Sequence, residues 1–337
     1  MACGSRFHQR RRSGAVLSFG PRTFPEFMRV AFNTLPDSLI SQLNNLSAQQ
    51  NRLQSQAATG QRIQQISDDP VAARRVLDLQ ANASQLTQFR QNIALLQDQA
   101  TASYNSIQGL KTISDRAGEI ATLADGTKSP DDLKTYAIEI TQLIQQGVQL
   151  MNSRHEGNYL FGGTNTNQPP YTVTTDANGN VTGVTYQGND TVPAAEVAEG
   201  ATVSVAVPGE NTSGSGPSGL ITDSRTGADF FNHLISLQNH LLAGDTASIA
   251  STDRAALLKD ENNILYNISS NGLVQSQLNA SDSAAASQLT SLKQSISQNA
   301  DADLAQTLTK LSATQTAYQA ALQSGARLFG QSLMDYM

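Results

Sequence analysis

The chain has 337 residues, of which 39% are hydrophobic, 15% charged and 5% aromatic, and its formal net charge is −6 at pH 7. The hydrophobic and charged fractions are low for an enzyme of this size, and Gln, Ser, Thr, Asn and Ala fill the balance. This composition favours long solvated helices with narrow apolar seams over one thick core. The single cysteine, Cys3, excludes a disulfide framework and a metal site built from cysteines.

The charge distribution excludes further classes of protein. Residues 1–27 carry five arginines and one glutamate, a charge of +4, so the remainder carries −10. No Lys or Arg lies between Arg154 and Arg225, and no basic stripe is present to neutralise a phosphate backbone. We therefore expect no nucleic-acid partner. No apolar run approaches the length of a membrane span, so we also expect no membrane partner.

Residues 1–27 differ from the rest of the chain. They are rich in arginine and faintly resemble a targeting segment, but their apolar stretch "GAVLSFG" is short and is followed by Pro21 and Pro25. Helical patterning begins only after Pro36. We interpret residues 1–27 as a disordered, dispensable extension from an upstream translation start, with Met28 as the first residue of the protein proper.

The first helical stretches are marked by their spacing and their start signals. An a/d seam typical of a coiled coil begins after Asp37. Its leucines are Leu39, Leu43, Leu46 and Leu53. The segment "TGQRI" at 59–63 interrupts the seam with a glycine where a helix would end. Asp69 then directly precedes Pro70, the cap-and-proline arrangement that starts a helix, and the apolar pattern that follows predicts one long helix to about Ala124.

A return helix follows a turn at 124–132, and it should form an antiparallel hairpin with the long helix. Its apolar face is expected to consist of Ile138, Leu143, Ile144, Val148 and Met151. It runs into "NYLFGGT", where Gly162 and Gly163 can supply a left-handed stop. We interpret Tyr159, Leu160 and Phe161 as a plug at a domain boundary rather than as a ligand site.

The middle of the chain changes character, and residues 165–220 are predicted to form a β-rich outer insertion. "DANGN" has Asn-Gly at its centre and predicts a hairpin turn, and 201–207 reads as a third strand. Helices return after 220. The last segment carries a second a/d seam, formed by Leu304, Leu308, Leu311, Tyr318, Leu322 and Phe329.

The expected fold is mainly α with a small β insertion: a long antiparallel helical hairpin, or coiled-coil rod, built from both chain ends. Each terminal seam can bury its apolar stripe only against a partner, first the other seam and then other subunits. The expected segments are the extension 1–27, a terminal helix in 28–66, helical rod in 67–164, the insertion 165–220, helical rod in 221–299 and a terminal helix in 300–337.

No pattern in the sequence points to an active site. Asp68 and Asp69 could be read as paired carboxylates, but the proline after them favours helix capping. His233 and His240 are seven residues apart on one predicted helix, too far to bind one metal ion, and we expect both to be solvated. No phosphate-binding glycine loop or nucleophile motif is present. We expect no catalytic, cofactor or metal site, and not an enzyme.

Three stretches resemble a known family. "TGQRIQQISDDPVAARR" resembles the N-terminal signature of flagellins and their relatives. Its Asp-Asp-Pro, together with "NYLFGGT" and the ending "AYQAALQSGARLFGQSLMDYM", is similar to the hook–filament junction members of that family. Flagellins proper usually have Asp-Asp-Ala-Ala-Gly at the helix start and lack a Ser-Leu-x-Asp-Tyr tail. The resemblance covers most of 28–337 and is weak across 165–220.

The resemblance implies an extracellular structural subunit, exported unfolded through the flagellar type III apparatus without a cleaved signal. The implied partners are other copies in the junction zone, the hook-side junction protein (hook-associated protein 1), flagellin, and an export chaperone that covers the C-terminal helix. We also expect terminal helices with so thin a seam to become ordered only on assembly. The alternatives are a short flagellin that forms the filament itself and a needle-tip or translocator protein of type III secretion.

Overall fold

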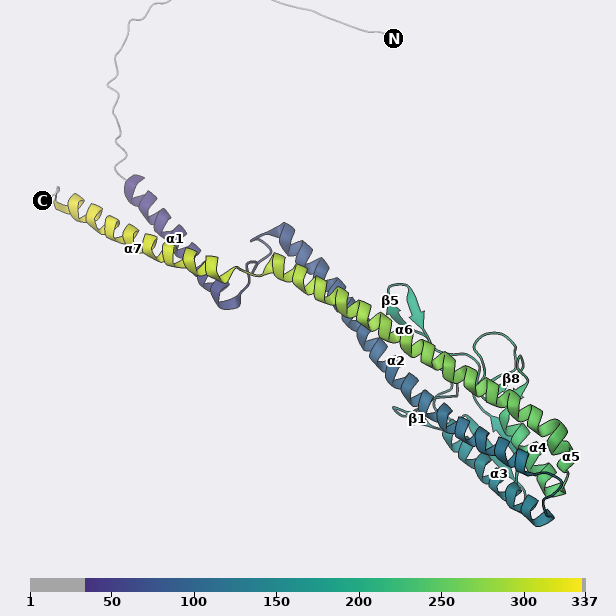
Figure 1. Cartoon of the computed structure of the whole chain (residues 1–337). Helices are drawn as coiled ribbons and strands as arrows, with labels where there is room; N and C mark the ends of the chain where they lie inside the picture. The colour runs from purple at the N-terminus through teal and green to yellow at the C-terminus, as the bar shows by residue number, and fades with distance from the viewer. Residues whose placement is uncertain (1–33, 335–337) are drawn as a thin grey trace, which may run out of the picture. The chain divides into compact units, whose positions relative to one another are not determined.

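The computed structural model describes residues 34–334, with side chains described for residues 37–327, so the expected extension 1–27 lies outside the described residues (Figure 1). The chain divides into two compact units. The first combines the described residues of both chain ends, 34–61 and 302–334. The second contains Arg62–Asp301. The mainly helical fold with a small β insertion is confirmed.

The first unit is an antiparallel pair of helices, α1 (Thr34–Thr59) and α7 (Leu304–Met334). At one end of the pair the backbone N–H of Ala302 donates to the carbonyl of Gly60 at 2.8 Å. Near the other end Leu39 of α1 lies against Gly325 of α7. Residues nearly 300 positions apart in the sequence therefore form one two-helix unit.

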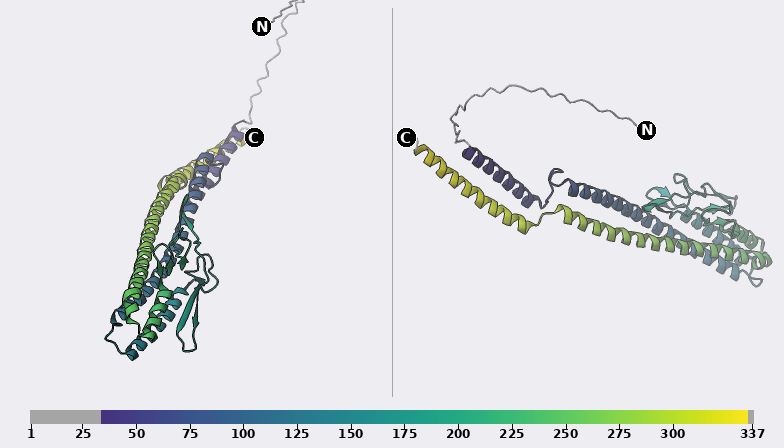
Figure 2. Two further views of the ribbon diagram at one scale, coloured as in Figure 1. Left: turned by 90° about the vertical axis from the view of Figure 1, so that its right-hand side faces the viewer. Right: turned by 90° about the horizontal axis from the view of Figure 1, so that it is seen from above.

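The second unit is built on another antiparallel pair, α2 (Pro70–Leu123) and α6 (Arg254–Ala300), which lie side by side in both views of Figure 2. Arg90 of α2 forms an ion pair with Asp282 of α6 at 2.7 Å. Toward the other end of the pair, the Arg254 guanidinium donates to the carbonyl of Ala121 at 2.9 Å. The partner of α2 along its length is thus α6.

The return helix α3 (Pro130–Met151) packs against only the last part of α2 and against α4 (Phe230–Ala243). Its start is capped on both sides: the Ser129 hydroxyl accepts from the Asp132 backbone N–H, and the Asp132 carboxylate accepts from the Ser129 backbone N–H. The segments α5 (Thr246–Ser248) and the π-helix η1 (Ile249–Asp253) connect α4 to α6. The predicted hairpin is present, but it is shorter than the α2–α6 pair.

The described residues contain four small sheets. Three are antiparallel hairpins: β1 (Arg154–His155) with β2 (Asn158–Tyr159), β3 (Tyr171–Thr175) with β4 (Val181–Tyr186), and β5 (Ala195–Ala198) with β6 (Ala201–Val203). The fourth joins β7 (Glu210–Asn211) in parallel to β8 (Thr222–Asp223), which pairs antiparallel with β9 (Ala228–Asp229). The strand expected at 201–207 is present but shorter, at 201–203, and it pairs with β5.

The strand-rich segment contributes to the helical core instead of standing apart from it, and its strands extend beyond both limits of the predicted 165–220. Tyr171, Val181 and Ile221 are buried in the main core together with residues of α2, α3 and α4. A second cluster joins Val197, Val203 and Val205 to apolar residues of α2 and α6. Alternating strand residues supply apolar side chains that cover helix faces left open by the α2–α6 pair.

Candidate functional site

The α1–α7 pair has a thin seam. On α1, Leu53 is buried, while Leu39, Leu43 and Leu46 are half-buried. The residues of α7 that face α1 repeat with alternating spacings of four and three. They are Thr307, Leu311, Thr314, Tyr318, Ala321 and Gly325. A Cβ at Gly325 would lie 2.6 Å from Leu39 Cδ2, so glycine here permits a close approach of the two helices.

The predicted C-terminal seam is split by this arrangement. Leu311 and Tyr318 face α1, whereas Leu304, Leu308 and Leu322 are 48%, 56% and 45% exposed. Phe329 belongs to α7, but its side chain lies outside the described residues. Compared with the predicted seam, the stripe that faces α1 is rotated around α7 toward threonines and small residues. These residues let α1 and α7 approach more closely than leucines would. We call Leu304, Leu308 and Leu322 the leucine face of α7; it is an apolar surface without a partner within the described residues.

The start of α2 is held by a carboxylate and an arginine. The Asp69 side chain accepts from the backbone N–H of Ala72 at 3.0 Å, and a proline follows it. This backbone bond, and next the Arg62 guanidinium at 3.2 Å, lower the pKa of Asp69. Arg62 also donates to the carbonyl of Asn299 at 2.7 Å, so it ties the start of α2 to the end of α6.

The neighbouring carboxylate has a structural role too. Asp68 accepts from the backbone N–H groups of Gln64 and Gln65 at 3.1 and 3.0 Å. Asp68 and Asp69 therefore each bind backbone amides at a turn and a helix start, and they are not arranged around a common substrate position. Sequence reasoning missed Arg62, because its two partners come together only in the folded unit.

The boundary stretch is buried: Tyr159 is 8%, Leu160 4% and Phe161 0% exposed. Phe161 packs in the main core with residues of α2 and α4. Gly162 and Gly163 do not end the return helix, which finishes at Met151 and is followed by the β1–β2 hairpin. The two glycines instead let the backbone pass close to neighbouring loop segments, because a Cβ at either would come within 2.3 Å of a backbone oxygen.

Two tyrosines beside this boundary differ in how their hydroxyls are satisfied. The ring centroids of Tyr171 and Tyr186 are 5.0 Å apart. Tyr186 Oη lies 2.9 Å from the Phe161 carbonyl and accepts from the backbone N–H of Gly209 at 3.2 Å. The buried Tyr171 hydroxyl finds no hydrogen-bond partner among the described residues. Burial raises the pKa of Tyr186 to about 12 and raises that of Tyr171 well above its ordinary value, so both stay neutral.

Removing each hydroxyl should change stability in opposite directions. We expect Tyr171→Phe to raise the free energy of unfolding, since a buried polar group without a partner is destabilising by about 1–3 kcal/mol. Tyr186→Phe should lower it by about 0.5–1.5 kcal/mol, the net contribution of a hydrogen bond. Urea unfolding of the two variants beside the unsubstituted protein measures both effects. A loss of stability in Tyr171→Phe would contradict the assignment of an unsatisfied hydroxyl.

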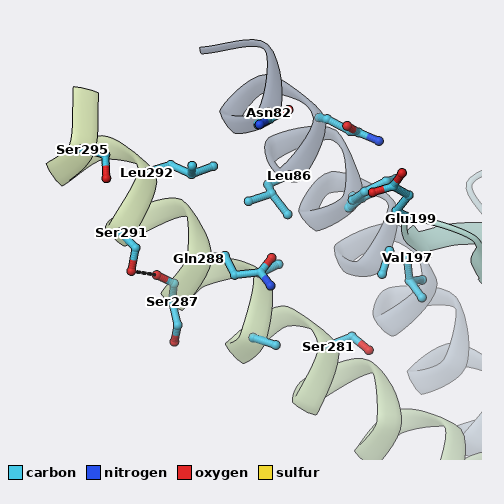
Figure 3. Close-up of a pocket in the computed structure, with 15 residues that line it drawn as sticks. Asn82, Leu86, Val197, Glu199, Ser281, Ser287, Gln288, Ser291, Leu292 and Ser295 are labelled. Atoms are coloured by element: carbon cyan, nitrogen blue, oxygen red, sulfur yellow. Dashed lines mark hydrogen bonds between the residues drawn. The ribbon is translucent and has the colours of Figure 1, made fainter. Parts of the chain in front are cut away.

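A groove of about 800 Å³ opens between α2, α6 and the β5–β6 hairpin (Figure 3). Leu86 of α2 and Leu292 of α6 line it from the two helices, together with Val197 of β5. Serines of α6 form much of the remaining wall. Glu199 is the one charged residue lining the groove in the described part of the chain. A single carboxylate among serines and aliphatic side chains offers no paired acid and base and no set of metal ligands.

The two histidines of α4 differ from the prediction that they are solvated. His233 Nδ1 lies 2.8 Å from Oδ2 of Asp260, and His240 Nδ1 lies 2.7 Å from Oδ2 of Asp253. Both carboxylates are buried. Asp253 and Asp260 are seven residues apart, and so are His233 and His240. Because the two segments run antiparallel, the first histidine meets the second aspartate and the second histidine meets the first. The prediction was wrong because the carboxylates lie on a different segment from the histidines.

The His233–Asp260 pair makes stability depend on pH. The hydrogen bond to Asp260 raises the pKa of His233, and burial raises the pKa of Asp260. A raised pKa in the folded state gives stability that is present at low pH and lost as the pH rises through the folded value. The α4–α6 contact should therefore weaken with rising pH.

We expect His233→Gln to lower the free energy of unfolding most below the ordinary histidine pKa of about 6.5, and less as the pH rises. The full effect should be about 1.5–3 kcal/mol, typical of a hydrogen bond to a charged group. Urea unfolding across this pH range measures it. His155→Gln is the control, at a histidine with no carboxylate partner in the described part of the chain. A loss that is equal at every pH would contradict the charged pair.

Within residues 34–334, no group of three or more His, Cys, Asp or Glu side chains is placed to hold a metal ion. The same part of the chain contains no helix that is both long and apolar enough to cross a membrane. The notable features are thus the paired terminal helices, the capped start of α2 and the leucine face of α7.

Residues 30–166 match the family model of the bacterial flagellin N-terminal helical region. This range contains α1, α2 with its Asp69–Pro70 start, and α3. These residues are flagellin-like. The flagellin-like chain is also 27% identical over 146 residues to flagellar hook-associated protein 3 of Salmonella typhimurium, a match that covers 43% of this chain and 46% of the relative. Flagellar hook-associated protein 3 of Escherichia coli is 28% identical over 131 residues, a match that covers 38% of this chain and 41% of that relative. The matched stretch spans about half the length of these curated relatives.

Solved structures show that the flagellin-like chain shares their fold. A protein described as a flagellar hook-associated protein from Vibrio parahaemolyticus aligns with a TM-score of 0.59 at 19% identity, over 69% of this chain and 100% of that chain. FlgL of Bacillus cereus aligns with a TM-score of 0.51 at 18% identity, over 65% of this chain and 99% of that chain. At these identities the likeness establishes the arrangement of helices and small sheets.

Proposed function

We propose that the flagellin-like chain is a structural subunit of the bacterial flagellum that joins the hook to the filament. The observation that carries the proposal is the match to two proteins named flagellar hook-associated protein 3, in a chain with the flagellin-type helical start. A structural role, rather than catalysis, also agrees with carboxylates used for helix capping and a groove with one charged residue.

The terminal helices are the proposed assembly surface. The α1–α7 seam buries few large apolar side chains, and polar residues such as Thr307 and Thr314 occupy part of it. The leucine face of α7 remains exposed, and fully burying one leucine side chain contributes about 1.5–3 kcal/mol. Neighbouring subunits supply that burial. The proposed neighbours are other copies of this chain, the hook-side junction protein (hook-associated protein 1) and flagellin.

The same surface supports a proposal about export. We propose that the chain leaves the cell unfolded through the flagellar type III apparatus, without a cleaved signal, and that its terminal helices, which pair only weakly in the isolated chain, become fully ordered on assembly outside the cell. A dedicated export chaperone would cover the leucine face of α7 before export, since an exposed apolar stripe otherwise promotes premature self-association. A thin seam that holds α1 to α7 weakly is compatible with unfolding for passage and refolding afterward.

Locating the protein on whole flagella tests the proposal. A labelled antibody against the chain should mark one short zone where hook meets filament, and a deletion strain should retain hooks but lose attached filaments. Label along the whole filament would identify a short flagellin instead. Absence of label from flagella, with label on another secretion needle, would point to a needle-tip or translocator protein and overturn the flagellar assignment.

A further inference from the structure

The described part of the chain holds two Asn-Gly pairs in contrasting surroundings. Asn178–Gly179 lies in the turn between β3 and β4, and Asn271–Gly272 lies inside α6. An asparagine followed by glycine is chemically vulnerable, because the unhindered glycine nitrogen can attack the side-chain amide. Whether this happens depends on exposure of the amide and on freedom of the backbone nitrogen. The two pairs allow both conditions to be compared within one molecule.

Asn178 meets both conditions. Its side chain is exposed and makes no hydrogen bond among the described residues. The Gly179 N–H is held only by a bond of 3.2 Å to the Asp176 carbonyl. No atom lies within 4 Å of the position a Cβ would take on Gly179, so there is room for a five-membered ring at this turn. Asp176 organises the turn by accepting from the backbone N–H groups of Asn178 and Asn180, each at 2.8 Å.

Asn271 meets neither condition. Its side chain is 4% exposed. Its amide nitrogen donates to the Ala100 carbonyl at 3.2 Å, and its oxygen accepts from Gln275 at 2.6 Å. Gly272 lies in the interior of α6, where its N–H belongs to the helical hydrogen-bond ladder. Ring closure at Asn271 therefore requires local opening of α6 and loss of both side-chain bonds.

We propose that Asn178 is a site of spontaneous covalent deamidation in the folded protein, and that Asn271 is protected by α6. The Gly179 nitrogen attacks Cγ of Asn178, a nitrogen–carbon bond forms, and the Cγ–Nδ2 bond breaks. The proton lost from the Gly179 nitrogen ends on the leaving group, which departs as ammonia. Water then opens the resulting succinimide at either carbonyl, giving aspartate or isoaspartate at position 178. No oxidant or reductant is needed.

The product has a local electrostatic consequence. Deamidation adds one negative charge to the segment between Arg154 and Arg225, which contains no Lys or Arg. The buried residues Tyr171 and Val181 anchor the hairpin on the core, so the change at its tip should leave the fold intact. Copies of the protein should therefore become more acidic at this surface as they age. The inference does not depend on the proposed function.

Incubation of the purified full-length protein at neutral and mildly alkaline pH tests the proposal. Acidic digestion followed by peptide mass spectrometry measures amide-to-acid conversion at each asparagine, and an isoaspartyl methyltransferase counts the isoaspartate formed. In the folded protein we expect conversion at position 178 to be at least about tenfold faster than at 271, a ratio that needs only about 1.4 kcal/mol of helix opening. In denaturant the two rates should become similar.

Two variants complete the design. Asn178→Gln should abolish most of the acid gain, because its ring would have six members and forms slowly, and its circular dichroism should match that of the unsubstituted protein. Asn180→Gln, in the same turn but not followed by glycine, should leave conversion at 178 unchanged within twofold. Equal rates at 178 and 271 in the folded protein would overturn the proposal. So would a stable Asn178 in the folded state with rapid conversion in denaturant.

Discussion

Leu308→Asp is expected to leave the unfolding of the isolated protein nearly unchanged and to abolish its incorporation into flagella. Leu308 is 56% exposed on α7, so a charge there stays in water in the isolated chain. Surface substitutions of this kind change stability by about 0.5 kcal/mol or less. In an assembly that buries the leucine face, the same carboxylate would lose its hydration and gain no hydrogen bond or opposite charge in return, which is strongly unfavourable. Thermal unfolding and recovery of the protein from sheared flagella measure the two effects.

Two matched variants separate assembly from pairing within the subunit. Ala313→Asp places the same charge at an exposed position roughly 140° around α7 from Leu308, and it should assemble normally. Leu311→Asp places the charge on the stripe that faces α1, and it should weaken the α1–α7 pair as well as assembly. If Leu308→Asp is found in flagella at normal amounts, the leucine face is not an assembly surface. If Leu311→Asp leaves α1 and α7 equally stable, that pair is not formed in the isolated chain.

Gly163→Ala is expected to lower the free energy of unfolding by about 2–5 kcal/mol, the sum of left-handed backbone strain and overpacking. The φ angle of Gly163 is 67°, which side chains rarely adopt. A Cβ there would also lie 2.2 Å from the Asn189 carbonyl oxygen, and neither backbone segment can move easily beside the buried Phe161. Urea unfolding followed by circular dichroism measures the loss.

Gly157→Ala is the control for the backbone part of this effect. Gly157 has a φ of 86° but nothing within 4 Å of its Cβ position. Gly157→Ala should therefore lower the free energy of unfolding by about 1–2 kcal/mol, the amount expected from backbone strain alone. Equal losses in the two variants would show that the close approach of Gly163 to Asn189 does not matter for stability.

The elements with local signals were predictable from the sequence. Asp69 before Pro70 and Ser129 before Pro130 mark helix starts because the capping bonds form within three residues of the cap. The turn at "DANGN" likewise needs only its own residues, and the structure places β3 and β4 on either side of it. In each case the interactions that decide the structure lie within a few positions in the chain.

The orientation of α7 could not be predicted in this way. A stripe through Leu304, Leu308 and Leu322 and a stripe through threonines share Leu311 and Tyr318, so periodicity alone does not choose between them. The burial of Thr307 and Thr314 against α1 decides it, and that packing joins helices at opposite ends of the chain. The pairing of His233 with Asp260 was missed for the same reason: the sequence shows each residue but not its neighbour.

The pairing of α1 with α7 also constrains the order in which the molecule can fold. Contacts between residues so distant in sequence form late, because a long loop must close first. A chain that emerges from a channel with its N-terminus leading would present α1 without its partner until the very end of the chain had followed. The local α2–α3 hairpin and its β strands could fold early, α6 would next close the second unit, and the α1–α7 pair would be completed last.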